Sequence, residues 1–323
     1  MLALASPASL KSVLKPLEAA LALAAGLREG GAEALELPVA DGGEGTAEVI
    51  AAARSGGRWG DADVTGPLGE PVRARYLVLE DGSAVVEAAE AIGLRLASRL
   101  DPLGASSRGL GELMLVAAEQ TTGTILVCLG DTATIDGGAG LREVVGDTLH
   151  ARALRAACDV RNPLLGERGA ARAFGPQKGA TRDMVDELER RLAAMDELRP
   201  YADLPGAGAA GGIGAALAAL GAELVSGAEL VLEQVGFSDA ARTADLVVTG
   251  EGVVDCSTFE GKAPGEVVRV CAEEGVRCVL FGGRLRERPA GVEIYELPGG
   301  PEGAAADLVE LGRKLAGAEL GVA

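Results

Sequence analysis

The chain has 323 residues, of which 48% are hydrophobic and only 2% aromatic, and its formal net charge is −18. A core built from Ala, Val, Leu and Ile suits α/β layers better than an all-β sandwich, and the length predicts two domains. The negative charge excludes sequence-independent nucleic-acid binding. The five cysteines are scattered and include no C-x-x-C pair, which excludes a disulfide framework and a structural zinc site. The lack of a long apolar run excludes a membrane span, so we expect a cytoplasmic protein.

The first sixty residues alternate between strand and helix. We predict strands at 2–5 and 34–39 and helices at 16–28 and 44–54. The pattern of apolar residues changes near residue 60. In 72–79 and 84–87 apolar and polar residues alternate, which is typical of antiparallel or mixed sheet.

The remaining predicted elements are a buried strand at 124–129, an amphipathic helix at 182–198, strands at 245–249 and 278–281, and helices at 264–272 and 302–315. Because strand and helix alternate at both ends of the chain, residues 1–60 plus 245–323 are predicted to form a Rossmann-like parallel-sheet domain. Residues 61–244 then form a second, inserted α/β domain. The active site is expected in the interdomain cleft.

The most informative motif is PVADGGEGT at residues 38–46, a turn between a predicted strand and a predicted helix. Its glycines, Gly42, Gly43 and Gly45, allow backbone N–H groups to approach a phosphate at a helix N-terminus. Its carboxylates, Asp41 and Glu44, can hold a metal or accept a proton.

Similar turns of glycine and carboxylate recur as GDTATIDGGAG at 130–140 and TGEGVVD at 249–255. Three such loops predict one site that handles phosphate. A fourth motif, GAGAAG at 206–211, matches the dinucleotide pattern G-x-G-x-x-G, but no convincing strand precedes it. It is either a nucleotide phosphate loop or a flexible turn that caps a helix at 213–220.

The single histidine, His150, removes most His-based mechanisms, and no Walker A motif is present. Any chemistry must therefore be carried by carboxylates and lysines. The candidates are Asp41, Glu44, Asp136, Asp159, Glu251 and Asp255, with Lys11, Lys178 and Lys262. For each carboxylate the alternative role is a turn or helix cap, which is common for Asp beside Gly.

Taken in order, these motifs resemble the bacterial type I glycerate kinases over nearly the whole chain. The resemblance also takes in VTGPLG at 64–69, EAA at 87–89, ACDVRNPL at 157–164, FGPQKGA at 174–180, PGAGAAGG at 205–212 and TGEGVVDCSTFEGKAPG at 249–265. It implies a two-domain α/β fold, with one Rossmann- or flavodoxin-like domain and the other inserted into it. It also implies transfer of the γ-phosphoryl group of ATP to D-glycerate with Mg²⁺, giving 2- or 3-phosphoglycerate.

With this resemblance, each candidate residue receives an expected role. The catalytic residues are expected to be Asp159, Asp41 and Asp136. Substrate or phosphate is expected on Ser9, Lys11, Lys178, Glu251, Asp255 and Lys262. ATP is expected on Gly42, Gly43, Gly45, Thr46, Gly208, Gly211 and Gly212, and the metal on Asp41 and Glu44. The partners are then ATP and a small hydroxy acid, with no nucleic acid and no membrane, and a homodimer is one option for the assembly.

Several positions depart from the family pattern. Ala8 stands where an aspartate is expected and Val253 where arginine is usual, while Asp131 replaces a glycine, Ile135 an asparagine and Ser257 a glutamine. Two alternatives to an ordinary glycerate kinase follow. One is a kinase of a related hydroxy acid, and the other is a catalytically weakened paralogue that binds its ligands without efficient turnover.

Overall fold

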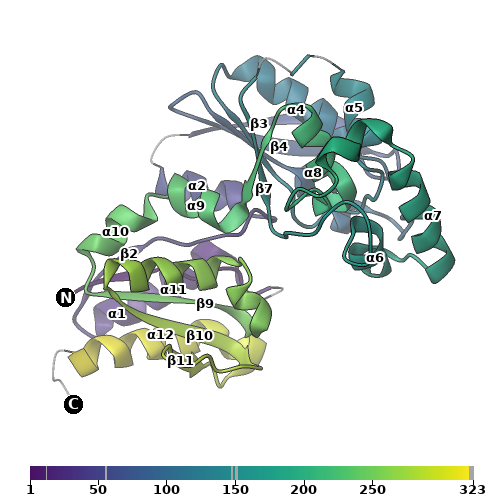
Figure 1. The fold of residues 1–323 in the computed structure, drawn as a ribbon. Helices are drawn as coiled ribbons and strands as arrows, with labels where there is room; N and C mark the ends of the chain where they lie inside the picture. The colour runs from purple at the N-terminus through teal and green to yellow at the C-terminus, as the bar shows by residue number, and fades with distance from the viewer. Residues whose placement is uncertain (12, 55–56, 147, 150–151, 320–323) are drawn as a thin grey trace. The chain divides into compact units, whose positions relative to one another are not determined.

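The structure is a computed structural model that describes residues 1–11, 13–54, 57–146, 148–149 and 152–319, so His150 lies outside the described residues. The chain forms two compact units (Figure 1). The first unit contains Met1–Asp41, Glu48–Ser55 and Ala228–Ala323, and the second contains Gly42–Ala47 and Gly56–Gly227. The predicted domain boundaries near residues 60 and 245 remain a prediction.

The first unit contains a five-stranded parallel sheet. Its strands are β1 (Leu2–Ala5), β2 (Glu33–Glu36), β9 (Leu246–Val254), β10 (Arg277–Leu285) and β11 (Glu293–Glu296), in the spatial order β11-β10-β9-β1-β2. Numbered within the unit, this order is 2-1-3-4-5, which is the flavodoxin-like arrangement. The expected Rossmann- or flavodoxin-like parallel sheet is thereby confirmed.

Helices cover both faces of this sheet (Figure 1). They are α1 (Pro16–Glu29), α10 (Phe237–Thr243), α11 (Ala263–Glu274) and α12 (Gly300–Glu319), while α2 (Thr46–Ala53) and α9 (Gly227–Gln234) begin in the second unit and continue in the first. Because successive side chains of a strand point to opposite faces, Ala3 and Ala5 of β1 pack in the same hydrophobic cluster as residues of α1 and α12. Leu4 packs instead with residues of α10 and α11.

The second unit contains a six-stranded mixed sheet in the order β3-β4-β5-β6-β7-β8. The strands are β3 (Gly57–Thr65), β4 (Pro71–Leu79), β5 (Ala84–Glu87), β6 (Ile125–Cys128), β7 (Leu154–Cys158) and β8 (Glu223–Ser226). β3 to β5 pair antiparallel and β5 to β8 pair parallel, as the alternation of apolar residues after residue 60 predicts. The helices are α3 (Ala88–Ile92), α4 (Arg108–Gln120), α5 (Ala139–Val145), α6 (Ala170–Phe174), α7 (Arg182–Ala193) and α8 (Ala209–Ala219), and a short 3₁₀ segment spans Pro176–Lys178.

Several element boundaries differ from the prediction. α2 begins at Thr46 rather than at residue 44, because Gly45 has a φ of +89° and cannot be part of a right-handed helix. The helix predicted to reach residue 198 ends at Ala193 and is followed by a 3₁₀ turn at Asp196–Tyr201. β9 continues to Val254, so Glu251 lies in a strand rather than in the predicted loop.

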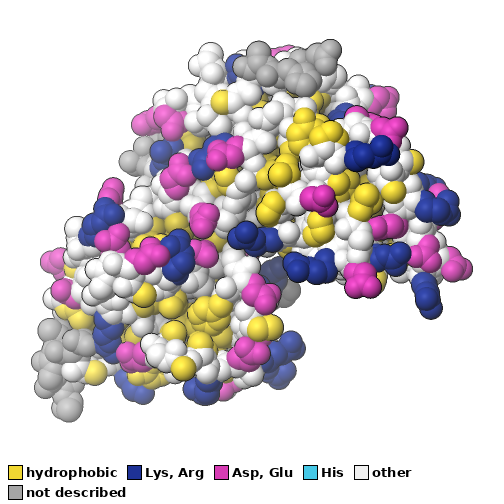
Figure 2. All heavy atoms as spheres, in the orientation of Figure 1, with side chains coloured by type: hydrophobic (Ala, Val, Ile, Leu, Met, Phe, Trp, Pro, Cys, Tyr) yellow, Lys and Arg dark blue, Asp and Glu magenta, His cyan; other side chains and the backbone are white. Residues whose placement is uncertain are grey.

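Charged side chains are distributed over the surface. On the face shown in Figure 2, Lys and Arg alternate with Asp and Glu instead of gathering in one basic patch. Within the described part of the chain, no helix has the length and apolar composition needed to cross a membrane.

Candidate active site

Topology gathers six predicted site residues at one edge of the first unit. The chain runs outward from β1 to β2 in one direction and from β9 to β10 and β11 in the other, so the order of the sheet reverses between β1 and β9. Ligands of open α/β sheets bind beyond the carboxyl ends of the strands at such a switch point. We call the residues that follow or end these strands the switch-point cluster: Ser9, Lys11, Asp41, Glu251, Asp255 and Lys262.

The centre of the switch-point cluster is an ion pair. Lys262 Nζ lies 3.4 Å from Glu251 Oε2 and 4.0 Å from Asp255 Oδ1, and Thr258 donates its hydroxyl to Glu251 Oε1 at 2.6 Å. Burial raises the pKa of Glu251, and the charge of Asp41 raises it further against the hydrogen bonds from Thr258 and Lys262. A carboxylate with a raised pKa beside a lysine is a common feature of functional sites.

Asp255 has a role in the local fold. Its carboxylate accepts hydrogen bonds from the backbone N–H and the hydroxyl of Ser257, which hold its pKa below the usual value, and it caps a 3₁₀ segment at Cys256–Phe259. This is the cap that was the alternative role for each carboxylate. Lys11 is exposed, and its backbone N would lie 3.5 Å from a Cβ placed on Gly252. The loop after β1 therefore lies close to β9.

The second unit has its own cluster at the carboxyl ends of β6 and β7. Lys178 is 4% exposed, and its ammonium donates to Thr132 Oγ1 at 3.1 Å and to the carbonyl of Thr134 at 2.9 Å. Burial lowers the pKa of Lys178 from 10.5 to about 8, and the charges of Asp159, Asp136 and Asp131 oppose that shift. We call these four groups the lysine cluster.

Asp159 is one of the two solvent-exposed carboxylates of the lysine cluster, the other being Asp131. It follows β7 immediately and is exposed to solvent. Its charge gives the largest opposition to the lowered pKa of Lys178. An accessible carboxylate next to a buried cation can accept a proton while the cation stabilises developing negative charge.

Asp136, which was expected to be catalytic, is saturated by local hydrogen bonds. Its carboxylate accepts from the backbone N–H of Ser107, Gly138 and Gly140 at 2.8, 3.1 and 3.2 Å and from the Ser107 hydroxyl at 2.7 Å. These contacts tie the start of α5 to the start of α4. The geometry therefore supports a capping role for Asp136 rather than proton transfer.

The turn before α2 binds carboxylates of its own unit. The N–H groups of Ala47 and Gly45 lie 2.6 and 3.4 Å from the two carboxylate oxygens of Glu87, which is only 5% exposed at the end of β5. The N–H of Glu44 donates to Asp131 at 3.3 Å. These carboxylates bind N–H groups of Glu44, Gly45 and Ala47 at the helix N-terminus, which attracts any anion, and the phosphate contact expected at Gly42, Gly43, Gly45 and Thr46 stays a prediction. Thr46 itself donates its hydroxyl to the carbonyl of Gly43 at 2.8 Å.

The glycines of the 206–212 motif are buried by close backbone contacts. A Cβ on Gly208 would lie 2.3 Å from the carbonyl oxygen of Pro163, and one on Gly211 would lie 2.1 Å from that of Thr134. Gly211 and Gly212 also have φ values of +72° and +97°. These positions need glycine for packing and for a left-handed turn, and the ATP contact expected at Gly208, Gly211 and Gly212 stays a prediction.

The two predicted metal ligands, Glu44 and Asp41, lie in different surroundings. Glu44 forms an ion pair with Arg95 at 2.9 Å on the surface of the second unit, whereas Asp41 belongs to the switch-point cluster of the first. Among the described residues, no group of three His, Cys, Asp or Glu side chains has the geometry to hold a metal ion.

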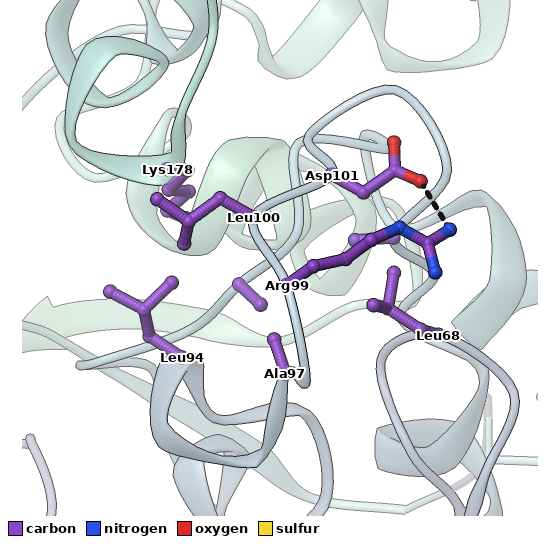
Figure 3. Close-up of a pocket in the computed structure, with 9 residues that line it drawn as sticks. Leu68, Leu94, Ala97, Arg99, Leu100, Asp101 and Lys178 are labelled. Carbon is purple, nitrogen blue, oxygen red and sulfur yellow. Dashed lines mark hydrogen bonds and ion pairs between the residues drawn. The ribbon is translucent and has the colours of Figure 1, made fainter.

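A small hollow adjoins the lysine cluster (Figure 3). It encloses about 170 Å³, including space open to solvent, and Figure 3 shows the ion pair between Arg99 and Asp101, at 2.9 Å, on its wall. The lining residues are Leu68, Leu94, Ala97, Arg99, Leu100, Asp101, Ala105, Ala133 and Lys178. Most of the wall is therefore apolar.

Sequence reasoning gave no role to Glu87, and it noted Asp131 only as a departure from the family pattern. Both carboxylates bind backbone groups that are far away in sequence, Glu87 on Ala47 and Asp131 on Glu44. The available signal was their position, because each stands at or just after the carboxyl end of a buried strand.

Comparison with known proteins agrees with this fold and these motifs. The sequence profile of the Glycerate kinase family matches residues 3–153 and 144–297. The chain is 41% identical to the Glycerate 2-kinase of Escherichia coli (strain K12), over 87% of this chain and 85% of that protein, and 38% identical to the Glycerate kinase of Bacillus subtilis (strain 168), over 87% and 84%. A crystal structure described as glycerate kinase 2 from Salmonella typhimurium LT2 superposes with a TM-score of 0.86 at 35% identity, covering 99% of this chain and 98% of that one. The chain belongs to the glycerate kinase family.

Proposed function

We propose that this protein is a glycerate kinase, which transfers the γ-phosphoryl group of ATP to a hydroxyl of D-glycerate. The observation that carries the proposal is the similarity, over nearly its whole length, to proteins named glycerate kinases. The lysines and carboxylates of the switch-point cluster and the lysine cluster suit phosphoryl transfer, because this reaction depends on positioning and charge neutralisation more than on covalent catalysis.

In this mechanism the hydroxyl oxygen of glycerate forms a bond to the γ-phosphorus while the bond from that phosphorus to the β–γ bridging oxygen breaks. The hydroxyl proton passes to the carboxylate of Asp159, and ADP leaves. Lys178 supplies a fixed positive charge near Asp159, and because Lys178 is buried its charge acts more strongly than it would in water. Lys11 and Lys262 are the cations that bind phosphate or the substrate carboxylate at the switch-point cluster.

Mg²⁺ fits the oxygen-rich character of both clusters. When bound with ATP it neutralises phosphate charge, and this ion usually takes one or two protein carboxylates together with phosphate oxygens and water. Asp41 of the switch-point cluster is the predicted ligand that would hold it, since Glu251 is already paired with Lys262. Glu44 is a weaker candidate than the sequence suggested, because Arg95 already neutralises it.

We also propose that the product is 2-phosphoglycerate, since the Escherichia coli relative is named Glycerate 2-kinase. Adding enolase to the reaction distinguishes the two products directly. Enolase dehydrates 2-phosphoglycerate, so absorbance from phosphoenolpyruvate should appear without a mutase. A signal that needs added phosphoglycerate mutase would establish the 3-phosphate instead.

The test of the function is ADP release from Mg-ATP with D-glycerate, beside L-glycerate, glycolate, lactate and tartronate. We expect D-glycerate to be turned over at about 1–100 s⁻¹. Turnover of another acid alone would establish a kinase of a related hydroxy acid. Silence across the panel with retained ATP binding would establish the non-catalytic paralogue.

The departures at Ala8 and Val253 keep those two alternatives open. Both residues lie near the switch-point cluster: the N–H of Ala8 donates to the carbonyl of Gly250 at 2.9 Å, and Val253 pairs in register with Arg284 of β10. Side chains of paired residues share a face of the sheet, so Arg284 offers a guanidinium beside the position where arginine is usual. In the double variant Ala8→Asp with Val253→Arg, a large gain in glycerate turnover would indicate a weakened paralogue, and a loss would indicate a changed substrate. The cytoplasmic location and the homodimer remain predictions.

A further inference from the structure

Asp131 has an unusual backbone conformation. Its φ is +59°, and the only other described residue besides glycine with a positive φ is Ala210, at +53°. A non-glycine residue in this region costs roughly 1–3 kcal/mol and persists where the surrounding structure imposes it. Aspartate adopts this conformation more readily than most residues, so the contacts of its side chain decide what the position does.

The carboxylate of Asp131 contacts the turn before α2. One oxygen accepts the N–H of Glu44 at 3.3 Å, while the carbonyl of Asp131 accepts the N–H of Leu94 at 2.9 Å. Next to it, the N–H of Gly130 donates to the carbonyl of Gly42 at 3.1 Å, and a Cβ on Gly130 would lie 2.5 Å from Gly43. The turn is thus held directly against the end of β6.

The same carboxylate is also part of the lysine cluster. Its charge favours the protonated form of Lys178, together with the charges of Asp159 and Asp136. Asp131 is exposed and follows the carboxyl end of β6, whereas Asp159 follows the carboxyl end of the neighbouring strand β7. One residue therefore interacts with both the acidic turn and the buried cation.

We propose that Asp131 is a positioning residue of the kinase site, whose carboxylate fixes the turn of residues 42–46 beside Lys178. The proposal rests on the proposed function for its effect on catalysis. The hydrogen bond from the Glu44 N–H to the Asp131 carboxylate, which we call the tether, is a property of the fold and can be measured without turnover.

Three variants separate the carboxylate from the backbone conformation. Asp131→Gly removes the carboxylate and relieves the strain, and Asp131→Asn keeps an acceptor oxygen in a residue that tolerates positive φ. Ala210→Gly is the matched control, because it relieves similar strain at a buried residue that carries no carboxylate.

The readouts are the melting temperature, kcat and KM for D-glycerate and ATP, and hydrogen exchange of the Glu44 amide. For Asp131→Gly we expect an unchanged or higher melting temperature, exchange at Glu44 faster by about tenfold, and kcat lower by about tenfold, the change that corresponds to one lost hydrogen bond. Asp131→Asn should restore most of the exchange protection and most of kcat. Ala210→Gly should leave the exchange at Glu44 unchanged.

Wild-type exchange at Glu44 in Asp131→Gly would refute the tether. Faster exchange with wild-type kcat and KM would refute the positioning role. If the wild-type protein itself does not phosphorylate glycerate, the proposed function fails, and the exchange measurement still decides whether Asp131 holds the turn.

Discussion

Replacing Lys178 by Met should make the protein more stable and nearly inactive. Burial lowers the pKa of Lys178 from 10.5 to about 8, which corresponds to roughly 3 kcal/mol at 1.36 kcal/mol per unit. Met fills a similar volume without charge. It leaves the acceptors on Thr132 and Thr134 without this donor, at a cost of about 1–2 kcal/mol. The expected net gain at pH 7 is therefore about 1–2 kcal/mol.

The pH dependence of stability has a definite sign. In the unfolded chain Lys178 stays protonated up to its ordinary pKa of 10.5, whereas in the folded protein it releases its proton near pH 8. Between these values the unfolded state binds more protons, so the contribution of Lys178 to stability rises with pH. Below pH 8 both states are protonated, and the full cost of burying the charge is present.

Urea unfolding at several pH values between 7 and 10.5 measures this effect as the difference between wild type and Lys178→Met. The advantage of the variant should shrink as pH rises through the window. Lys15→Met is the control, because the Lys15 side chain is 65% exposed and should show no such trend. Under the proposed mechanism, turnover of Lys178→Met should fall by about 100-fold or more, because the positive charge near Asp159 is lost. An equal or lower stability of Lys178→Met at pH 7, with a pH trend matching wild type, would refute the reasoning.

Three further predictions address carboxylates and packing. Asp159→Asn should lower kcat by about 100-fold or more with an unchanged melting temperature, and retained turnover would remove Asp159 from the mechanism. Asp136→Asn should lower stability by about 2–4 kcal/mol in urea unfolding, because an amide cannot accept all four hydrogen bonds; an unchanged midpoint would contradict the capping role. Gly26→Ala should destabilise by about 1–3 kcal/mol, because its Cβ would lie 1.9 Å from the carbonyl oxygen of Val309 in α12, and wild-type stability would show that the two helices separate easily.

The contrast between Asp159 and Asp136 separates a role in catalysis from a role in stability. Both are aspartates in a loop motif, and both act on the charge of Lys178. Asp159 is exposed just after β7, whereas Asp136 accepts four hydrogen bonds from residues at the starts of α4 and α5. One substitution should therefore affect the rate and the other the stability.

The sequence by itself determined the class of the fold and the family. Short apolar runs such as 124–129 and 245–249, set between amphipathic helices, suffice to predict parallel sheet, because burial on both faces requires a continuous apolar strand. The order of the motifs along the chain identifies the family, because that order does not depend on which motifs come together in the folded protein. The acidic turns also identify the edge of each sheet at which the candidate site residues lie, since the loops that follow parallel strands lie at one edge.

Only the tertiary structure shows which donors reach these carboxylates. Asp136 sits in a glycine-rich loop, and the fold brings to it the N–H and the hydroxyl of Ser107, 29 positions earlier. Glu87 ends a strand, and the fold brings to it the N–H of Ala47, 40 positions away. Such partners depend on strand order and on the path of the chain between strands. A carboxylate accepts hydrogen bonds equally well from backbone and from ligand, so its role follows from which donors the fold brings to it.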